Sequence, residues 1–594
     1  MDYLWSLKDL YSSFEGDDFK KDMESLNNVL KDYTLWVDKT IENNDNTKEK
    51  LENFIALKAD FFKLASKLFA FSELSYSVDT KNEKALKNSE KVQVKLSSIA
   101  EPDAKINRWI GSIPNIDDFI NSSELLKEHE FFLKEIVSKS DYLLSGREEA
   151  AIAKMRNTGS TAWLKLKDLL TSTLKVDIEL EGEHKQLPLS VIRNMAYDGD
   201  RELRKKAYLA ELKAYKKIDD SLAACLNGIK GEVITVADMR GFKSPLEETL
   251  FNSRMDEETL AAMLDAMRES LPAFRKYLKV KGELLGSKTG LPFFDLFAPV
   301  GEVNKKYSYE EAQKVVVDNF RTFSDRLADF AKRAIENSWI DVYPREGKIG
   351  GAFCENLHAI GQSRVMLNYG ETFSDILTMA HELGHGFHDD CVVNESILNS
   401  DYPMPLAETA SIFCETIVKK SAVKTATRDE AFAILEMELS DCTQVIVDIY
   451  SRFLFESELF ERRKNSSLTT EEVNEIMLWA QKEAYGDGLD PEYLHKYMWA
   501  CKPHYYTANA NFYNFPYAFG QLFAKGLYAE YEKRGNSFVR DYEKLLSVTG
   551  KNKIADVTKL MNVDVRNIDF WKSSLKTIEE DIEKFVELSM EKLK

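Results

Sequence analysis

The sequence predicts a mainly α-helical fold, and three observations support this. Only 13 Pro and 26 Gly interrupt 594 residues, so long helices are possible. Apolar residues recur every three or four positions along much of the chain, as on the buried face of an amphipathic helix. Strand-like alternation is confined to a few short stretches.

The N-terminal part reads as a series of amphipathic helices. Helical spacing is clear, for example, over residues 51–74 and 123–137, and polar turns such as residues 42–46 separate the helical stretches. No repeat of fixed period is present. Residues 1 to about 170 are therefore expected to form a helical region.

A short hairpin is expected next. Apolar and charged residues alternate over residues 176–180, and Gly182 follows at the turn, which predicts two strands within residues 175–190. Helical patterns resume afterwards. We place a domain boundary here, with an N-terminal helical lobe at residues 1–200 and a second domain at residues 201–594.

Two further strands are predicted in the second domain, at residues 348–353 and 364–369. Gly350 and Gly351 would let another backbone approach closely. An extended peptide could add to a free strand edge through backbone hydrogen bonds. Alternatively, the pair is a small hairpin that only supports the following helix.

The next helix carries the motif His381-Glu382-x-x-His385. Thr372 and Asp375 form a capping box that predicts its start. Residues four apart lie on one face of a helix, so the two imidazoles can converge on one metal ion, with Glu382 beside them as a general base. Both histidines project away from the predicted core stripe, which comprises Ile376, Met379, Ala380, Leu383 and Phe387.

A catalytic zinc takes three protein ligands, so a third must come from elsewhere. His388 shares the face but sits about 4.5 Å further along the axis than His385, which suits packing or a supporting role. Cys391 stands where a metzincin carries its third histidine, but that pattern requires glycine at position 388. Neither residue is favoured.

Glu408 is the best candidate for the third ligand. Prolines at positions 403 and 405 predict a new helix start. Glu408 and Glu415 fall on the face opposite its core stripe, so Glu408 could reach the metal. Glu415 either hydrogen-bonds a ligating imidazole or points to solvent. The core stripe comprises Leu406, Ala410, Phe413 and Ile417.

These motifs resemble the thimet oligopeptidase superfamily of zinc metallopeptidases, and specifically the oligoendopeptidase F family. The resemblance extends over nearly the whole chain, at residues 4–11, 291–296, 350–354, 381–385, 408–415 and 512–517. It implies a large helical two-lobed body with a deep central channel, which holds one zinc ion and admits short unfolded peptides. It also implies one small sheet beside the active site.

The resemblance further implies that an aromatic-rich segment contacts the substrate. His504 matches a histidine, and Tyr513 and Tyr517 match tyrosines, that donate hydrogen bonds to the substrate and to the oxyanion formed during hydrolysis. Which of the two tyrosines stabilises the oxyanion stays open.

The composition limits the partners and the compartment. A formal net charge of −19 argues against nucleic acid and anionic membrane surfaces as partners. Six Cys without a C-x-x-C pair favour reduced thiols in a reducing compartment. The start at Met1-Asp2 lacks the features of a signal peptide. We therefore expect a cytoplasmic protein, as a monomer or small homo-oligomer.

The sequence thus predicts a zinc-dependent endopeptidase acting on short peptides. The metal would be held by His381, His385 and Glu408, with Glu382 as the base. One alternative is a metal-dependent exopeptidase, for which Arg364 or Lys502 could bind a peptide terminus. Another is a non-catalytic peptide-binding or metal-binding helical protein.

Overall fold

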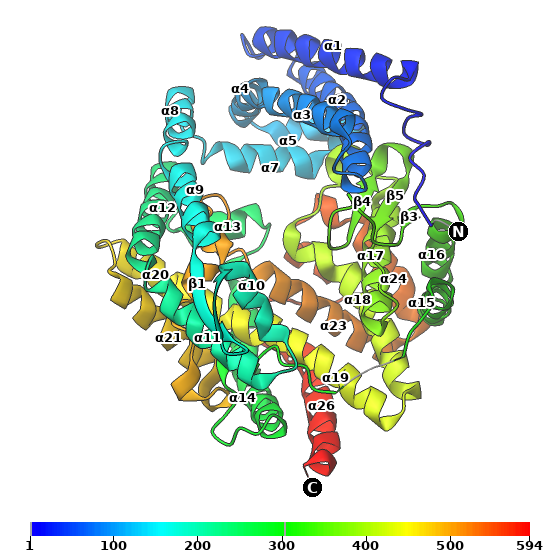
Figure 1. Cartoon of the computed structure of the whole chain (residues 1–594). Helices are drawn as coiled ribbons and strands as arrows, with labels where there is room; N and C mark the ends of the chain where they lie inside the picture. The colour runs from blue at the N-terminus through cyan, green and yellow to red at the C-terminus, as the bar shows by residue number, and fades with distance from the viewer. Residues whose placement is uncertain (1–2, 302–304, 594) are drawn as a thin grey trace. The chain divides into compact units, whose positions relative to one another are not determined.

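The fold is mainly α-helical, as predicted (Figure 1). The computed structural model describes residues 3–301 and 305–593; Met1 and Asp2, where a signal peptide would begin, lie outside them. Two compact units are present, each assembled from three chain segments. Unit 1 comprises Met1–Leu143, Asn304–Ser421 and Glu530–Val563, and unit 2 comprises Leu144–Val303, Ala422–Ala529 and Asp564–Lys594. Packing units of this kind do not test the predicted boundary near residue 200, which stays a prediction.

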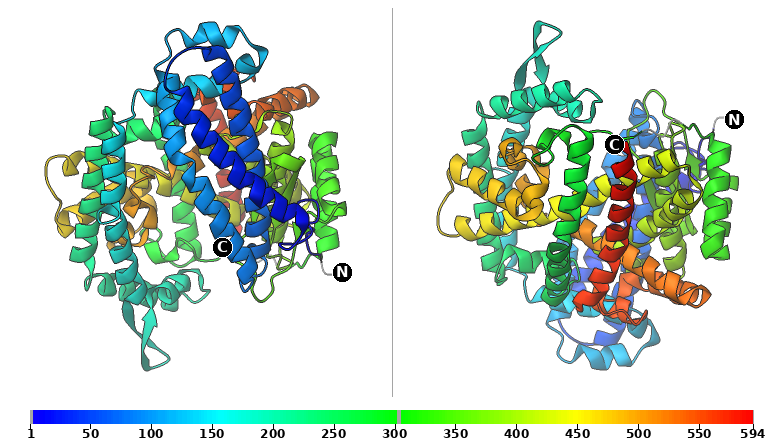
Figure 2. Two further views of the ribbon diagram at one scale, coloured as in Figure 1. Left: turned by 90° about the horizontal axis from the view of Figure 1, so that it is seen from above. Right: turned by 90° about the horizontal axis from the view of Figure 1, so that it is seen from below.

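Unit 1 is a helical assembly with one small sheet. Its helices are α1 Asp17–Thr40, α2 Thr47–Ser77, α3 Glu83–Ser98, α4 Ala100–Gly111, α5 Ile116–Asn121, α6 Glu124–Glu128, α7 Glu130–Ser140, α15 Tyr309–Phe323, α16 Asp325–Glu336, α17 Phe373–Val392, α24 Asn536–Ser547 and α25 Ile554–Lys559, together with most of α18 Met404–Thr425. At its N-terminal end, α1 and α3 pack against α2, as Figure 2 shows from above. Phe54, Phe61 and Leu68 of α2 are fully buried in that core.

The predicted N-terminal helices are present, with one break. The stretch 51–74 lies inside α2. The stretch 123–137 is divided between α6 and α7, because His129 leaves the helical conformation at φ −103° and ψ 20°. The His129 ring is hydrogen-bonded through Nδ1 to the Leu125 carbonyl at 2.8 Å, so its side chain turns back onto the preceding helix.

The sheet of unit 1 has three strands, β3 Ile340–Asp341, β4 Phe353–Leu357 and β5 Gln362–Met366, in the order β3-β5-β4. β5 overlaps the strand predicted at 364–369. The strand predicted at 348–353 is wrong in position, since β4 begins only at Phe353. Gly351 has φ +86°, a left-handed conformation that a regular strand does not use, so pairing starts after it. β4 and β5 both pack against α17 (Figure 1).

Unit 2 contains the predicted hairpin and the remaining helices. β1 Lys175–Leu180 and β2 Glu183–Pro188 pair antiparallel, and Figure 2 shows them projecting beyond the neighbouring helices of this unit. The helices are α8 Gly146–Arg156, α9 Ser160–Thr173, α10 Leu189–Asn194, α11 Arg201–Tyr215, α12 Asp219–Arg240, α13 Pro245–Asn252, α14 Glu257–Leu284, α19 Arg428–Thr443, α20 Ile449–Arg463, α21 Thr470–Tyr485, α22 Met498–Cys501 and α26 Ile568–Lys592, together with most of α23 Phe515–Arg534.

Long helices give unit 2 its core. α14 and α26 pack along each other, and α19 packs on α26. A π-helical turn at Gln444–Asp448 joins α19 directly to α20. None of the helices in the described ranges combines the length and the apolar character needed to cross a membrane.

Candidate metal centre

α17 positions the two motif histidines. Its start is fixed by the predicted capping box, in which the Asp375 amide donates to Thr372 Oγ1 and the Thr372 amide donates to the Asp375 carboxylate. The predicted core stripe is buried. His381 and His385 lie on the opposite side and keep about a fifth to a quarter of their side-chain surface exposed. The helix therefore presents both rings away from its packed face.

α18 brings a carboxylate to the same place. Its predicted core residues are all buried against the rest of unit 1. Gly384 lies where α17 meets α18, and a Cβ atom built on it would fall 2.6 Å from Ser411 Cα and 2.7 Å from the Ala410 carbonyl oxygen. The absence of a side chain at Gly384 thus lets the two backbones approach closely. Ser411 also donates a hydrogen bond of 2.8 Å to Glu408 Oε2, which orients that carboxylate.

The three predicted ligands converge. His381 Nε2 lies 3.1 Å from His385 Nε2, and Glu408 Oε2 lies 3.3 Å from the first and 3.6 Å from the second. Ligands about 2.0–2.1 Å from a tetrahedral zinc ion are about 3.3 Å apart, so these donor atoms fit such an ion. Within residues 3–301 and 305–593, no other group of three His, Cys, Asp or Glu side chains brings its donor atoms so close together.

Glu415 supports the first histidine. Its Oε1 lies 2.5 Å from His381 Nδ1, which leaves Nε2 of that ring to face the other two donors. Lys419, one turn further along α18, forms an ion pair of 2.9 Å with Glu415. Burial raises the pKa of Glu415, but Lys419 and His381 outweigh it and hold that pKa at about 2. The sequence left the role of Glu415 open and did not reveal Lys419, although its i+4 spacing from Glu415 could have indicated the pair.

Glu382 is a buried carboxyl beside the donor atoms. Burial raises its pKa to about 7, since the charged form loses its hydration, while His381 works in the opposite direction. A carboxyl with a pKa near neutrality can both accept and return a proton. Burial also lowers the pKa of His385 to about 4; burial acts in the same direction on His381, but Glu415 outweighs it and raises the pKa of that ring to about 9.

The two disfavoured ligand candidates lie outside this group of donors. The His388 ring stacks on Tyr402 with centroids 3.9 Å apart, and its Nε2 is hydrogen-bonded to Thr549 Oγ1 at 2.8 Å. Cys391 is buried in the same helix, and burial raises the pKa of its thiol. Both residues pack within unit 1.

The aromatic residues predicted to contact substrate form a cluster of their own in unit 2. The His504 ring stacks on Tyr513 with centroids 5.9 Å apart, and the hydroxyls of Tyr513 and Tyr517 are hydrogen-bonded at 3.0 Å. Burial lowers the pKa of His504 to about 3, so its ring is neutral. Within the described ranges, His504 Nε2 is buried and has no hydrogen-bond partner. The described residues thus leave this buried nitrogen unsatisfied.

A buried polar network holds the turn before Tyr513. Glu456 of α20 accepts hydrogen bonds from Lys230 Nζ at 2.7 Å and from the Phe512 amide at 3.0 Å, and Lys230 also donates to Asn511 Oδ1 at 2.9 Å. Phe512 has φ +52°, which a residue with a side chain adopts only when its surroundings enforce it. No sequence pattern indicated this network, since Lys230, Glu456 and Asn511 are far apart along the chain.

The two residues proposed to bind a peptide terminus differ in their surroundings. Arg364 is fully buried, donates to the Ser6 carbonyl at 2.8 Å and pairs with Asp9 at 3.1 Å, so its charge is used within unit 1. Lys502 lies in unit 2 at the edge of a cavity.

The chain matches two family models. Residues 194–577 match the model for peptidase family M3, and residues 113–175 match the model for oligopeptidase F. The chain is 22% identical to oligopeptidase PepF of Bacillus subtilis, covering 99% of this chain and 87% of the relative. It is 26% identical to an oligoendopeptidase F homolog of Lactococcus lactis, covering 81% of this chain and 79% of the relative.

Solved structures share the fold. A protein from Chlamydophila abortus superposes with a TM-score of 0.86 at 22% identity, covering 99% of this chain and 98% of the other. Oligoendopeptidase-F from Enterococcus faecium superposes with a TM-score of 0.70 at 19% identity, covering 96% and 98%. From the long match to the family model, the chain belongs to peptidase family M3, a family of metallo-oligopeptidases.

Proposed function

We propose that the protein is a zinc-dependent endopeptidase that hydrolyses internal bonds of short, unfolded oligopeptides. The observation that carries this proposal is the convergence of His381, His385 and Glu408 from two helices, with donor atoms 3.1–3.6 Å apart. Two imidazoles and one carboxylate are the protein ligands of many catalytic zinc sites, which keep a further position for water. The family match supports a peptide as the substrate.

In this proposal, zinc held by these three residues would polarise the attacking water and the scissile carbonyl. Glu382 takes a proton from the water onto its carboxylate and later gives it to the leaving nitrogen. Burial raises the pKa of the Glu382 carboxyl, which favours its holding the proton before the transfer to the leaving nitrogen. Glu415 keeps the His381 ring oriented through Nδ1, so that Nε2 stays directed at the metal.

His504, Tyr513 and Tyr517 are proposed to donate hydrogen bonds to the substrate and to the negative charge that develops on its carbonyl oxygen. Their mutual contacts within unit 2 support a shared role. The neutral His504 ring has one N–H to donate, and its Nε2 lacks a protein partner in the described part of the chain.

β4 is the proposed seat for the peptide backbone. In the described sheet, β4 pairs on one side only, with β5, so it is an edge strand. Cys354 of β4 would lie 3.5 Å from a Cβ atom on Gly386, which places the strand beside the motif helix. A peptide added to this edge would be held by backbone hydrogen bonds, which accept many side-chain sequences.

The first test asks where the protein cleaves short peptides and whether cleavage needs a metal. The purified protein is incubated with a mixture of short peptides, with and without a chelator, and the products are identified by mass spectrometry. Cuts inside the peptides that stop after chelation support the proposal, whereas cuts only at peptide ends favour an exopeptidase. Absence of any cleavage by the metal-loaded protein would favour a non-catalytic binding protein.

The variant Glu382→Gln separates the roles at the centre. It should keep its zinc while cleavage falls by several orders of magnitude, because Gln cannot accept the proton. Glu408→Ala should instead lose the metal, which elemental analysis measures. Full zinc occupancy in Glu408→Ala would remove Glu408 from the ligand set.

We further propose a cytoplasmic location and a monomeric or small homo-oligomeric state, with no nucleic-acid or membrane partner. The six cysteines are free thiols, which is the usual state in a reducing compartment. Cell fractionation and light scattering would test these points.

A further inference from the structure

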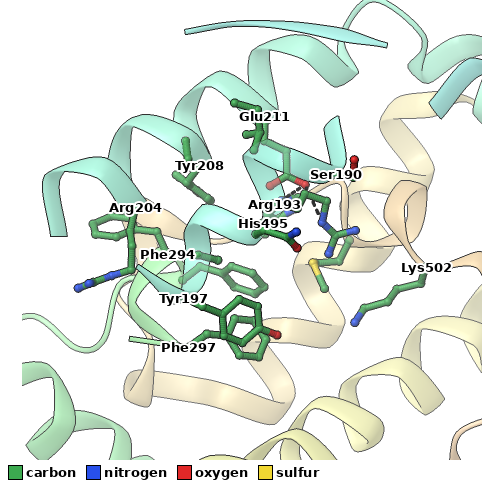
Figure 3. A pocket seen from close by; sticks show the side chains of 16 residues that line it. Ser190, Arg193, Tyr197, Arg204, Tyr208, Glu211, Phe294, Phe297, His495 and Lys502 are labelled. Carbon is green, nitrogen blue, oxygen red and sulfur yellow. Dashed lines mark ion pairs between the residues drawn. The ribbon is translucent and has the colours of Figure 1, made fainter. Parts of the chain in front are cut away.

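Unit 2 contains a cavity of about 370 Å³ that is separate from the residues assigned to the metal centre. Its size falls in the range of roughly 300–1,000 Å³ that is usual for small-molecule sites. α10, α11 and the turn between them line one part, and residues 293–297 and 495–502 line the rest. Figure 3 shows the side chains around it.

Aromatic rings form one wall of the cavity. The rings of Tyr197 and Phe297 have centroids 4.9 Å apart, and those of Tyr208 and Phe294 are 5.7 Å apart. Tyr197 is 62% exposed, although it stands in contact with Phe297. Such a wall buries a flat or bulky apolar group favourably, through both area and ring geometry.

Most charges around the cavity are already compensated. Arg193 Nε lies 3.4 Å from Glu211 Oε1, and His495 Nε2 lies 3.5 Å from the same oxygen (Figure 3). Arg204 is paired with Asp295 at 2.8 Å. Glu211 therefore carries no free negative charge that would repel an incoming anion.

Lys502 is the exception. Within residues 3–301 and 305–593, no hydrogen bond or ion pair reaches its ammonium group. Burial lowers its pKa, although Asp448 counteracts this. Figure 3 shows its ammonium end directed toward the aromatic side of the cavity. Lys502 is only partly exposed, and an anion bound beside its ammonium group would form a charge-assisted hydrogen bond with it.

We propose that this cavity binds a small carboxylate attached to an aromatic or bulky apolar group. The carboxylate would pair with Lys502, and the apolar group would pack against Phe297 and Tyr197. Two sources share this chemistry, namely the last residue of a peptide with a free C-terminus and a free arylalkanoic acid. Binding requires neither the metal nor hydrolysis, so this inference stands apart from the proposed function.

The test is direct binding to the full-length protein by isothermal titration calorimetry. N-acetyl-L-phenylalanine should bind, and its amide, which lacks the negative charge, should bind at least about tenfold more weakly. Equal binding of acid and amide would overturn the proposal, and so would the absence of binding by the acid. A third probe, 3-phenylpropionate, identifies the source: binding as tight as that of N-acetylphenylalanine indicates free arylalkanoic acids, and much weaker binding indicates a peptide terminus.

Two variants tie the binding to this cavity. Lys502→Met should weaken binding of N-acetylphenylalanine at least about tenfold, whereas the matched control Lys496→Met, in the same segment but outside the lining, should bind as the parent does. Phe297→Ala removes the apolar wall from a different segment and should also weaken binding. If both Lys502→Met and Phe297→Ala bind like the parent, the site is not this cavity. Thermal melting confirms that each variant is folded, and the acid and amide comparison on the parent decides the ligand class even if Lys502→Met fails to fold.

Discussion

Gly384 and Ser411 are in direct backbone contact, since a Cβ atom on Gly384 would lie only 2.6 Å from Ser411 Cα. The hydroxyl of Ser411 in turn orients Glu408. A single contact between two helices therefore sets the distance between the two motif histidines on α17 and the carboxylate on α18.

Gly384→Ala should separate α17 from α18 and weaken the metal site. The added methyl group meets backbone atoms, which cannot rotate away, so the helices must shift by several tenths of an ångström or more. We expect metal affinity to fall at least about tenfold and peptide cleavage to fall with it. Competition with a chromogenic chelator measures the affinity. Gly199→Ala is the control, because no atom of the described residues lies within 4 Å of its added Cβ; equal losses in both variants would contradict the prediction.

Glu415→Gln should weaken metal binding by about 10–100-fold while leaving the three ligands in place. Gln can still accept a hydrogen bond from His381 Nδ1, but the loss of charge reduces the basicity of that ring. Zinc titration followed by elemental analysis measures the change. Glu336→Gln, at the exposed end of α16, is the matched control, and an affinity equal to that of this control would show that Glu415 does not support His381.

Glu456→Gln should impair catalysis without affecting the metal. It leaves Lys230 buried without a charged partner and weakens the hold on the Phe512 amide, at a cost of about 3–5 kcal/mol in the stability of unit 2. Because the turn leads directly to Tyr513, kcat/KM should fall about tenfold or more at temperatures where the variant stays folded. Glu458→Gln, at a partly exposed position of the same helix, should behave as the parent. Unchanged kcat/KM in folded Glu456→Gln, or loss of zinc from it, would contradict the positioning role.

Asp389→Asn should change how stability depends on pH. Burial raises the pKa of Asp389 from its ordinary value of 3.8 to about 8, although Tyr402 and Ser363 donate hydrogen bonds to it. Between about pH 4 and pH 8 the unfolded chain releases a proton that the folded protein keeps, so Asp389 makes the folded state less stable as pH rises, by about 1.4 kcal/mol per pH unit. Below about pH 4 and above about pH 8 this dependence disappears.

Asparagine does not titrate, so the variant should lack this dependence. The measurement is the melting temperature at pH 5, 6 and 7. The melting temperature of the variant should rise relative to that of the parent with each step in pH. If the melting temperatures of the two proteins change with pH in the same way over this range, Asp389 is ionised in the folded state.

Much of the metal centre could be predicted because the sequence patterns that indicate it involve residues close together along the chain. The capping box at Thr372 and the helical spacing of His381 and His385 depend on neighbours within one or two turns. The apolar stripe of α18 likewise predicted which face Glu408 would occupy. The strand before the motif was misplaced by several residues, because apolar alternation continues through Gly350 and Gly351, while the left-handed backbone at Gly351 ends it.

The sequence by itself determined the helical class of the fold, the motif helix and the identity of the residues that converge as donors. Only the tertiary structure decided what surrounds them: the contact of Gly384 with Ser411, the Lys419 partner of Glu415, the Lys230 and Glu456 network, and the place of Lys502 at an aromatic cavity. The physical reason is that periodicity and capping report interactions between residues a few positions apart. Compensation of a buried charge depends on side chains brought together from distant segments, and no local pattern records which of them will meet.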